Sequence, residues 1–218
     1  MTMDGPRLKA QSGKAKHLVV FLHGYGADGN DLIDLGQQWQ SLLPDAAFIS
    51  PHAPEPCGMS PMGRQWFPLT MRDPSERWWG VVGARAALDA FLDAELVRLN
   101  LGHDRLALVG FSQGTMMALH VGLRRATPPA AILGYSGELV GPEHLTEATG
   151  KPPILLVHGD RDEVIPLDAV FSSSNALGQA EIGCQYHLSI GVGHGIDGGG
   201  LHHGGLFLAK ALTGKTSG

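Results

Sequence analysis

Short apolar runs, each followed by a polar loop or a segment with helical spacing, recur along the whole chain. Apolar runs of this length are typical of strands that are buried on both faces of a parallel sheet. The predicted strands are 17–22, 46–49, 106–109, 130–133, 154–157 and 185–190. Apolar residues at helical spacing predict helices within 28–43, 74–100, 115–125, 167–177 and 201–212.

This order of strands and helices predicts an α/β fold, in which a mostly parallel sheet carries helices on both faces. No repeat, low-complexity tract or linker interrupts the chain, so we expect a single domain over 1–218. Residues 1–16 are expected to form an N-terminal extension, and residues 213–218 a polar tail.

One long segment, 52–77, has no regular period and mixes prolines with large apolar side chains. A long loop in a compact domain is usually functional, for example as one wall of a binding site or as a lid. The alternative is that it only seals the edge of the core. Candidate wall residues for a substrate are Met59, Met62, Trp66, Phe67 and Met71.

The composition narrows the class of protein. The 218 residues carry a formal net charge of −5 without any basic block, which disfavours nucleic-acid binding. Cys57 and Cys184 make no disulfide framework, which fits a reducing compartment. Residues 1–16 lack the apolar core of a signal peptide, and no apolar run approaches the roughly 20 residues of a membrane span. We therefore expect a cytoplasmic protein without stable membrane insertion.

The segment 106–114 reads LALVGFSQG and leads from a predicted strand into a predicted helix, with Ser112 at the turn between them. In this context a G-x-S-x-G match is typical of a nucleophile elbow. The alternative is a glycine-rich turn whose serine merely caps the helix. The strand before and the helix after favour Ser112 as a catalytic nucleophile.

Three polar loops that follow predicted strands hold Ser112, Asp162 and His194, in that chain order. Open parallel sheets place their sites at the carboxyl ends of strands, and serine, acid, histidine is the order of the α/β-hydrolase fold. His194 would take the proton of the serine hydroxyl, while a buried carboxylate would fix the imidazole tautomer and stabilise the imidazolium. Spacing leaves open whether Asp160 or Asp162 is that acid, since Asp160 could tie its loop to its own backbone amides.

His202 and His203 compete with His194, but they open a predicted helix, where surface or capping roles suit them better. Candidate donors for an oxyanion hole are the backbone N–H groups of Gln113, which follows the nucleophile, and of Tyr25 in the loop HGYG at 23–26. The alternative for that loop is a tight turn into the next helix.

Other chemistries find less support. The histidines and aspartates of these loops show no recognised metal spacing. Residues 214–216 resemble the end of a P-loop, but Ala209 stands where the motif should open and no strand precedes it. Residues 24–29 have the G-x-G-x-x-G spacing after a predicted strand, but a single match of this kind is a weak signal, and no dinucleotide site is inferred from it.

From about residue 18 to 212, the chain resembles the phospholipase/carboxylesterase family of α/β hydrolases, which includes bacterial carboxylesterases and acyl-protein thioesterases. Four sequence blocks carry the resemblance. They are FLHGYG at 21–26, GFSQG at 110–114, HGDRD at 158–162 with Val164 and Pro166, and GVGH at 191–194.

The resemblance implies an α/β-hydrolase fold, Asp162 as the triad acid, and oxyanion amides from Tyr25 and Gln113. Trp66 and Phe67 fall at the aromatic pair of the family's acyl-pocket loop, although Pro68 stands where an aspartate is usual. The stretch 51–69 diverges from the thioesterase branch of the family.

We therefore expect a serine carboxylesterase that hydrolyses small-molecule esters with small to medium apolar acyl groups, with no metal or organic cofactor. Lysophospholipase or acyl-protein thioesterase activity is the alternative within the hydrolases. A non-catalytic, ligand-binding member of the fold is the alternative from another class. Dimers are common in the family, so a homodimer is compatible with the sequence.

Overall fold

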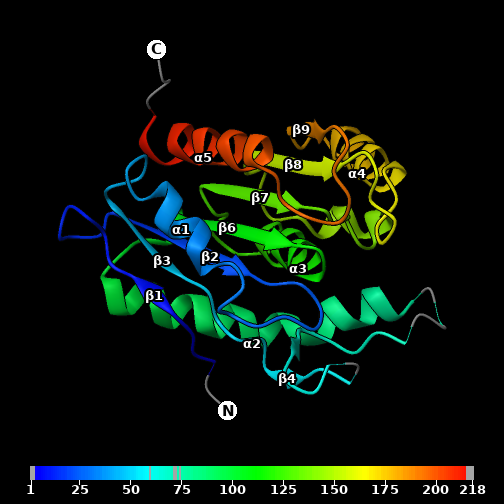
Figure 1. The fold of residues 1–218 in the computed structure, drawn as a ribbon, viewed down its shortest axis with the longest axis horizontal. Coiled ribbons are helices and arrows are strands. Elements are labelled where there is room, and N and C mark those ends of the chain that lie inside the picture. Colours follow the sequence, from blue (N-terminus) through cyan, green and yellow to red (C-terminus); the bar gives the residue numbers. More distant parts are fainter. Residues whose placement is uncertain (1–2, 59, 71–72, 74, 215–218) are drawn as a thin grey trace.

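The computed structural model describes residues 3–58, 60–70, 73 and 75–214. Seven strands form one sheet in the order β1-β3-β2-β6-β7-β8-β9, parallel except for β1, as Figure 1 shows. These strands are β1 Arg7–Leu8, β2 His17–Leu22, β3 Ala46–Ile49, β6 Leu106–Phe111, β7 Ala131–Tyr135, β8 Ile154–Gly159 and β9 Cys184–Ser189. The sheet confirms the α/β class, and the six strands predicted from the apolar runs are all present with small differences at their ends.

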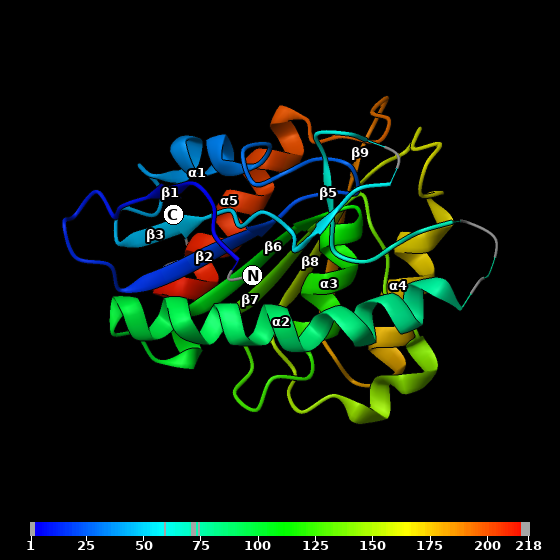
Figure 2. The same cartoon turned by 90° about the horizontal axis from the view of Figure 1, so that it is seen from below.

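Helices cover both faces of the sheet, and Figures 1 and 2 show α2 on one side and α5 on the other. The α-helices are α1 Ile33–Trp39, α2 Glu76–Leu99, α3 Gln113–Gly122, α4 Asp168–Gln179 and α5 Gly198–Thr213. Two short 3-10 helices are η1 His103–Arg105 and η2 Pro142–Glu147. Because parallel strands here are enclosed on both sides, β2, β3 and β8 are buried along their whole length.

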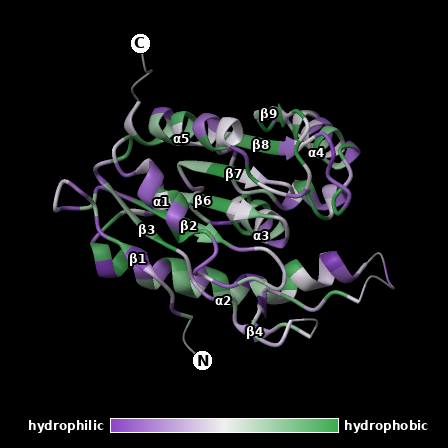
Figure 3. Ribbon diagram, in the orientation of Figure 1, coloured by the Kyte–Doolittle hydropathy of each residue, from purple (hydrophilic) through white to green (hydrophobic). Residues whose placement is uncertain are grey.

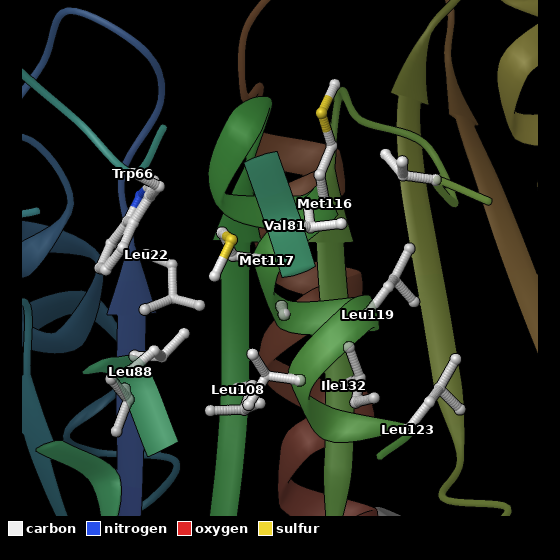
Figure 4. Close-up of a cluster of buried hydrophobic side chains, with 14 of the residues drawn as sticks. Leu22, Trp66, Val81, Leu88, Leu108, Met116, Met117, Leu119, Leu123 and Ile132 are labelled. Atoms are coloured by element: carbon white, nitrogen blue, oxygen red, sulfur yellow. The ribbon is translucent and has the colours of Figure 1, made fainter. Parts of the chain in front are cut away.

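Two apolar clusters fill the space between the sheet and its helices, and they account for the hydrophobic colour of the central strands in Figure 3. One cluster packs α2, α3 and α4 against the sheet, and Figure 4 shows part of it, with Leu22, Leu108 and Met117 pointing into the same space. The other cluster joins α1 and α5 through residues such as Trp39 and Leu208. Both clusters hold the strand ends, and therefore the loops that follow them, in fixed positions.

Two features of the fold were not predicted. Within the expected N-terminal extension, β1 pairs antiparallel with β3, and the Arg7 guanidinium donates a hydrogen bond of 2.7 Å to Glu95 in α2. The segment 52–77 contains a small antiparallel pair, β4 Glu55–Pro56 with β5 Arg64–Gln65. Strands of two residues carry no periodic signal, so tertiary contacts decide them.

Helix α1 is shorter than the predicted 28–43. Asp28 accepts a hydrogen bond of 2.8 Å from the Asn30 backbone, which closes a turn before the helix begins. Among the described residues, no helix combines the length and apolar character that crossing a membrane requires.

Candidate active site

Ser112 lies between β6 and α3 with φ 53° and ψ −116°, a backbone conformation that non-glycine residues seldom adopt. Its N–H donates to the carbonyl of Tyr135 at 2.9 Å, which fixes the turn to the neighbouring strand. A Cβ on Gly114 would lie only 1.8 Å from the carbonyl oxygen of Leu22. The backbone of α3 therefore packs directly against that of β2, and only glycine fits at this position. The side chain of Ser112 thus stands at the sharp strand–helix turn that the motif predicts.

Asp162 and His194 contact each other directly. The Nδ1–H of His194 donates to Oδ2 of Asp162 at 2.7 Å, since an ionised carboxylate only accepts. The other carboxylate oxygen accepts hydrogen bonds of 2.9 Å from the backbone N–H groups of Val164 and Ile165. Burial alone would raise the pKa of Asp162, but the bonds from Ile165, His194 and Val164 outweigh it and lower the pKa. The Asp162 side chain is therefore a buried, ionised partner for the imidazole.

The loop that carries His194 makes one contact with the residue before Ser112 and one with the end of β7. The ring of Phe111, the residue before Ser112, lies 4.9 Å from the His194 ring, centre to centre. The hydroxyl of Ser136, at the end of β7, donates to the carbonyl of Gly195 at 3.5 Å. The loops that carry Ser112, Asp162 and His194 therefore meet at the carboxyl end of the sheet.

The competing candidates lie elsewhere. Asp160 accepts a 2.6 Å hydrogen bond from the backbone N–H of Gly191, in the loop after β9. It therefore joins two loops, whereas sequence analysis suggests a bond within its own loop. His202 and His203 lie in α5, where the ring of His203 is 4.2 Å from that of His187. Of the two aspartates, Asp162 is the one in contact with His194.

The loop after β2 passes close to the serine. A Cβ on Gly24 would lie 3.5 Å from the Cβ of Ser112, so glycine leaves the space in which this backbone approaches the elbow. Within the described part of the chain, the backbone N–H groups of Tyr25 and Gln113 donate to no other residue. Both are free donors near Ser112, where sequence analysis predicts an oxyanion hole.

The residues predicted to form the substrate wall differ widely in their exposure to solvent. Trp66 and Phe67 are 1% and 2% exposed, and Figure 4 shows Trp66 beside Leu22 in the core. Met62 is 89% exposed, while Met59 and Met71 lie outside the described residues. The role of these side chains in binding an acyl group stays a prediction.

Two side chains support the site in ways that the sequence did not indicate. The Gln113 side chain accepts from the Trp66 backbone N–H at 2.9 Å and donates to the Phe67 carbonyl at 2.8 Å. His158, the first residue of the HGDRD block, donates through Nε2 to the carbonyl of Ile165 at 2.8 Å. The same nitrogen lies 3.5 Å from Oδ2 of Asp162, so His158 braces the loop of the acid. Its place at the start of the HGDRD block is the only signal that could have indicated this.

The sequence matches the phospholipase/carboxylesterase family over residues 3–212. It is 30% identical to the esterase YpfH of Escherichia coli K12, over 84% of this chain and 78% of that protein. It is 31% identical to acyl-protein thioesterase 1 of Schizosaccharomyces pombe, over 72% of this chain and 73% of that protein. The crystal structure of esterase PE8 superposes with a TM-score of 0.94 at 45% identity, covering 97% of this chain and all of that one (100%). A carboxylesterase from Mesorhizobium loti shares the fold at 20% identity and a TM-score of 0.76, over 96% of this chain and 95% of that one.

Proposed function

The chain belongs to the phospholipase/carboxylesterase family and is a carboxylic ester hydrolase, and on this basis we propose that Ser112, His194 and Asp162 form its catalytic triad. The observation that carries the proposal is the 2.7 Å hydrogen bond from His194 to a buried Asp162, beside a serine in strained turn geometry. The proposed reaction is hydrolysis of esters with small to medium apolar acyl groups through an acyl-enzyme.

In the acylation step, the Ser112 hydroxyl attacks the ester carbonyl and its proton passes to His194. Because Nδ1 of His194 faces Asp162, Nε2 is the nitrogen that takes this proton. The tetrahedral intermediate then collapses, the bond to the leaving alcohol breaks, and Nε2–H returns the proton to that alcohol. The acyl group remains on Ser112 as an ester.

In the deacylation step, a water molecule attacks the acyl-enzyme while His194 takes one of its protons. Collapse of the second intermediate releases the carboxylic acid and returns the proton to the Ser112 oxygen. In both steps the Asp162 carboxylate stabilises the imidazolium of His194. Because the pKa of Asp162 is lowered, this carboxylate is ionised at neutral pH.

The proposed oxyanion donors are the backbone N–H groups of Tyr25 and Gln113. Gln113 is the first residue of α3, so the positive end of that helix would favour the developing negative charge as well. Losing one such donor typically costs about 10²–10³ in rate. No metal or organic cofactor takes part in this mechanism.

The acyl-group preference is tested by a series of p-nitrophenyl esters of increasing chain length. We expect kcat/KM to be highest for short to medium acyl chains and to fall for long ones. A rate that rises steadily to long chains would contradict the proposed size class, although it would leave ester hydrolysis intact.

Thioester cleavage is the second candidate, favoured by the match to acyl-protein thioesterase 1 of S. pombe. Rates on an oxyester and a thioester with the same acyl group separate the two activities. The alternative of a non-catalytic binding protein predicts that a fluorophosphonate probe leaves Ser112 unlabelled.

We also propose a cellular location and a set of partners for the enzyme. We place it in the cytoplasm, since Cys57 and Cys184 are both free thiols and suit a reducing compartment. Its partners in this proposal are small-molecule esters and, for assembly, a second copy of the chain. Nucleic acid is not among them, because the net charge is −5.

A further inference from the structure

We propose that His23 is a positioning residue that orients the Gly24–Tyr25 peptide group, so that the Tyr25 N–H faces the oxyanion. This inference rests on the proposed function, because it assigns a task to a residue beside the same site. His23 directly follows β2 and is fully buried, at 0% exposure.

The hydrogen bonds of His23 define its tautomer. Nδ1 lies 2.8 Å from the carbonyl oxygen of Gly24, and a carbonyl only accepts, so Nδ1 carries a proton. Nε2 lies 3.0 Å from the backbone nitrogen of Ala53, whose N–H only donates, so Nε2 is unprotonated. The two contacts agree on one neutral form, the Nδ1–H tautomer.

The planar peptide unit links the hydrogen bond between His23 and the Gly24 carbonyl to the oxyanion hole. The Gly24 carbonyl and the Tyr25 N–H belong to one rigid trans peptide and point in opposite directions. The carbonyl accepts from His23 at 2.8 Å and from the Ala27 N–H at 3.2 Å. Holding the carbonyl therefore fixes the direction of the Tyr25 N–H, on a backbone that approaches Ser112.

His23 is itself held on several sides. Its carbonyl accepts from the indole N–H of Trp66 at 2.9 Å, and the two rings lie 5.5 Å apart. The backbone of Trp66 is in turn bound by the Gln113 side chain. A continuous set of contacts thus joins the segment of Tyr25 to that of Gln113, so that the two proposed donors are fixed relative to each other.

The charge state of His23 suits this role. Burial lowers its pKa to about 4, despite the opposing bond to Gly24. At neutral pH the ring is therefore uncharged, so that Nε2 stays an acceptor for Ala53. The mechanism needs only this fixed tautomer and no proton transfer by His23.

Two substitutions separate the two ring nitrogens. In His23→Asn, the amide nitrogen can take the place of Nδ1 and still donate to Gly24. In His23→Gln, the longer side chain can reach Ala53 but leaves the Gly24 carbonyl without its donor. His17→Gln is a matched control, because His17 is a buried histidine at the other end of β2.

We expect His23→Gln to lower kcat for a short p-nitrophenyl ester by about 10²-fold, the loss typical of one oxyanion donor, with KM little changed. Affinity for a trifluoromethyl ketone, which forms a tetrahedral adduct, should fall by a similar factor. His23→Asn should keep at least a tenth of the wild-type kcat, and His17→Gln should match wild type. Equal losses in both His23 variants, or wild-type kcat in His23→Gln, would overturn the proposal.

A measurement on the unmodified protein removes any dependence on how the variants fold. Nitrogen-15 NMR of the histidine rings should show His23 as the neutral Nδ1–H tautomer at pH 7. The Nε2–H tautomer or a charged ring would overturn the proposal. Failure of wild type to hydrolyse any ester would instead refute the proposed function, and the NMR result would still decide the tautomer.

Discussion

Nδ1 of His194 lies 2.7 Å from Oδ2 of Asp162, although the two residues are 32 positions apart in the chain. The contact exists because β8 and β9 are parallel neighbours, so the loops that follow them emerge at the same edge of the sheet. Asp160 strengthens this arrangement by accepting from Gly191, which holds the second loop against the first.

The role of the acid is tested by Asp162→Asn. The amide nitrogen of asparagine can donate to Nδ1 of His194, which would force the proton onto Nε2, where the serine needs an acceptor. We therefore expect kcat to fall by about 10⁴ with little change in the fold. Asp160→Asn is the control, because its side-chain oxygen can still accept from Gly191 and its kcat should stay within threefold of wild type. A loss below tenfold in Asp162→Asn would remove Asp162 from the triad.

Acid should destabilise the protein through its buried histidines. Burial and the charge of Arg124 lower the pKa of His120 to about 3, against 6.5 in an unfolded chain. Between these values the unfolded state binds a proton that the folded state does not, so stability rises with pH across this window. Each such histidine contributes a slope of about 1.4 kcal/mol per pH unit.

His120→Phe checks this slope, since it removes the titrating group and keeps a ring beside Trp78. Urea unfolding between pH 6.5 and about 4 should show a shallower loss of unfolding free energy than in wild type. Identical slopes in the two proteins would mean that His120 does not bind its proton on unfolding.

The close approach at the elbow is tested by Gly114→Ala. The added Cβ would meet the backbone carbonyl of Leu22 at 1.8 Å, and neither group can move without shifting β2 or α3. We expect a loss of about 3 kcal/mol in unfolding free energy, together with reduced esterase activity.

Gly83→Ala is the matched control in α2, because nothing lies within 4 Å of its Cβ position. Alanine is the better helix former there and should stabilise the protein by up to about 1 kcal/mol. If both alanine variants had equal melting temperatures, the contact at Gly114 would not be a constraint on the fold.

Sequence patterns predicted the sheet and the loops of the site because those signals are local. The strand before Ser112 and the glycines around it appear within nine residues of the sequence, 106–114. β1 was not predicted because a two-residue strand has no period and is defined by its pairing with β3, which lies far along the chain. The role of His23 was missed for a similar reason, since its ring is fixed by Ala53, 30 positions along the chain.

Local sequence patterns did not predict where the side chains of the candidate substrate wall lie. Trp66 and Phe67 were selected as large apolar residues on a long loop, yet contacts with Gln113 and His23 bury them beneath the surface. Met62 carries the same apolar signal and is almost fully exposed. Side-chain type alone does not distinguish these two placements.

The central claim is that Ser112 is the nucleophile, and hydrolysis of a short p-nitrophenyl ester by Ser112→Ala tests it most directly. The alanine variant should remain folded, with an unchanged far-ultraviolet circular dichroism spectrum. Its kcat should fall by about 10⁶, leaving only the small residual rate that substrate binding and the oxyanion hole provide without a nucleophile. Turnover close to that of wild type would contradict the assignment of Ser112 and the mechanism built on it.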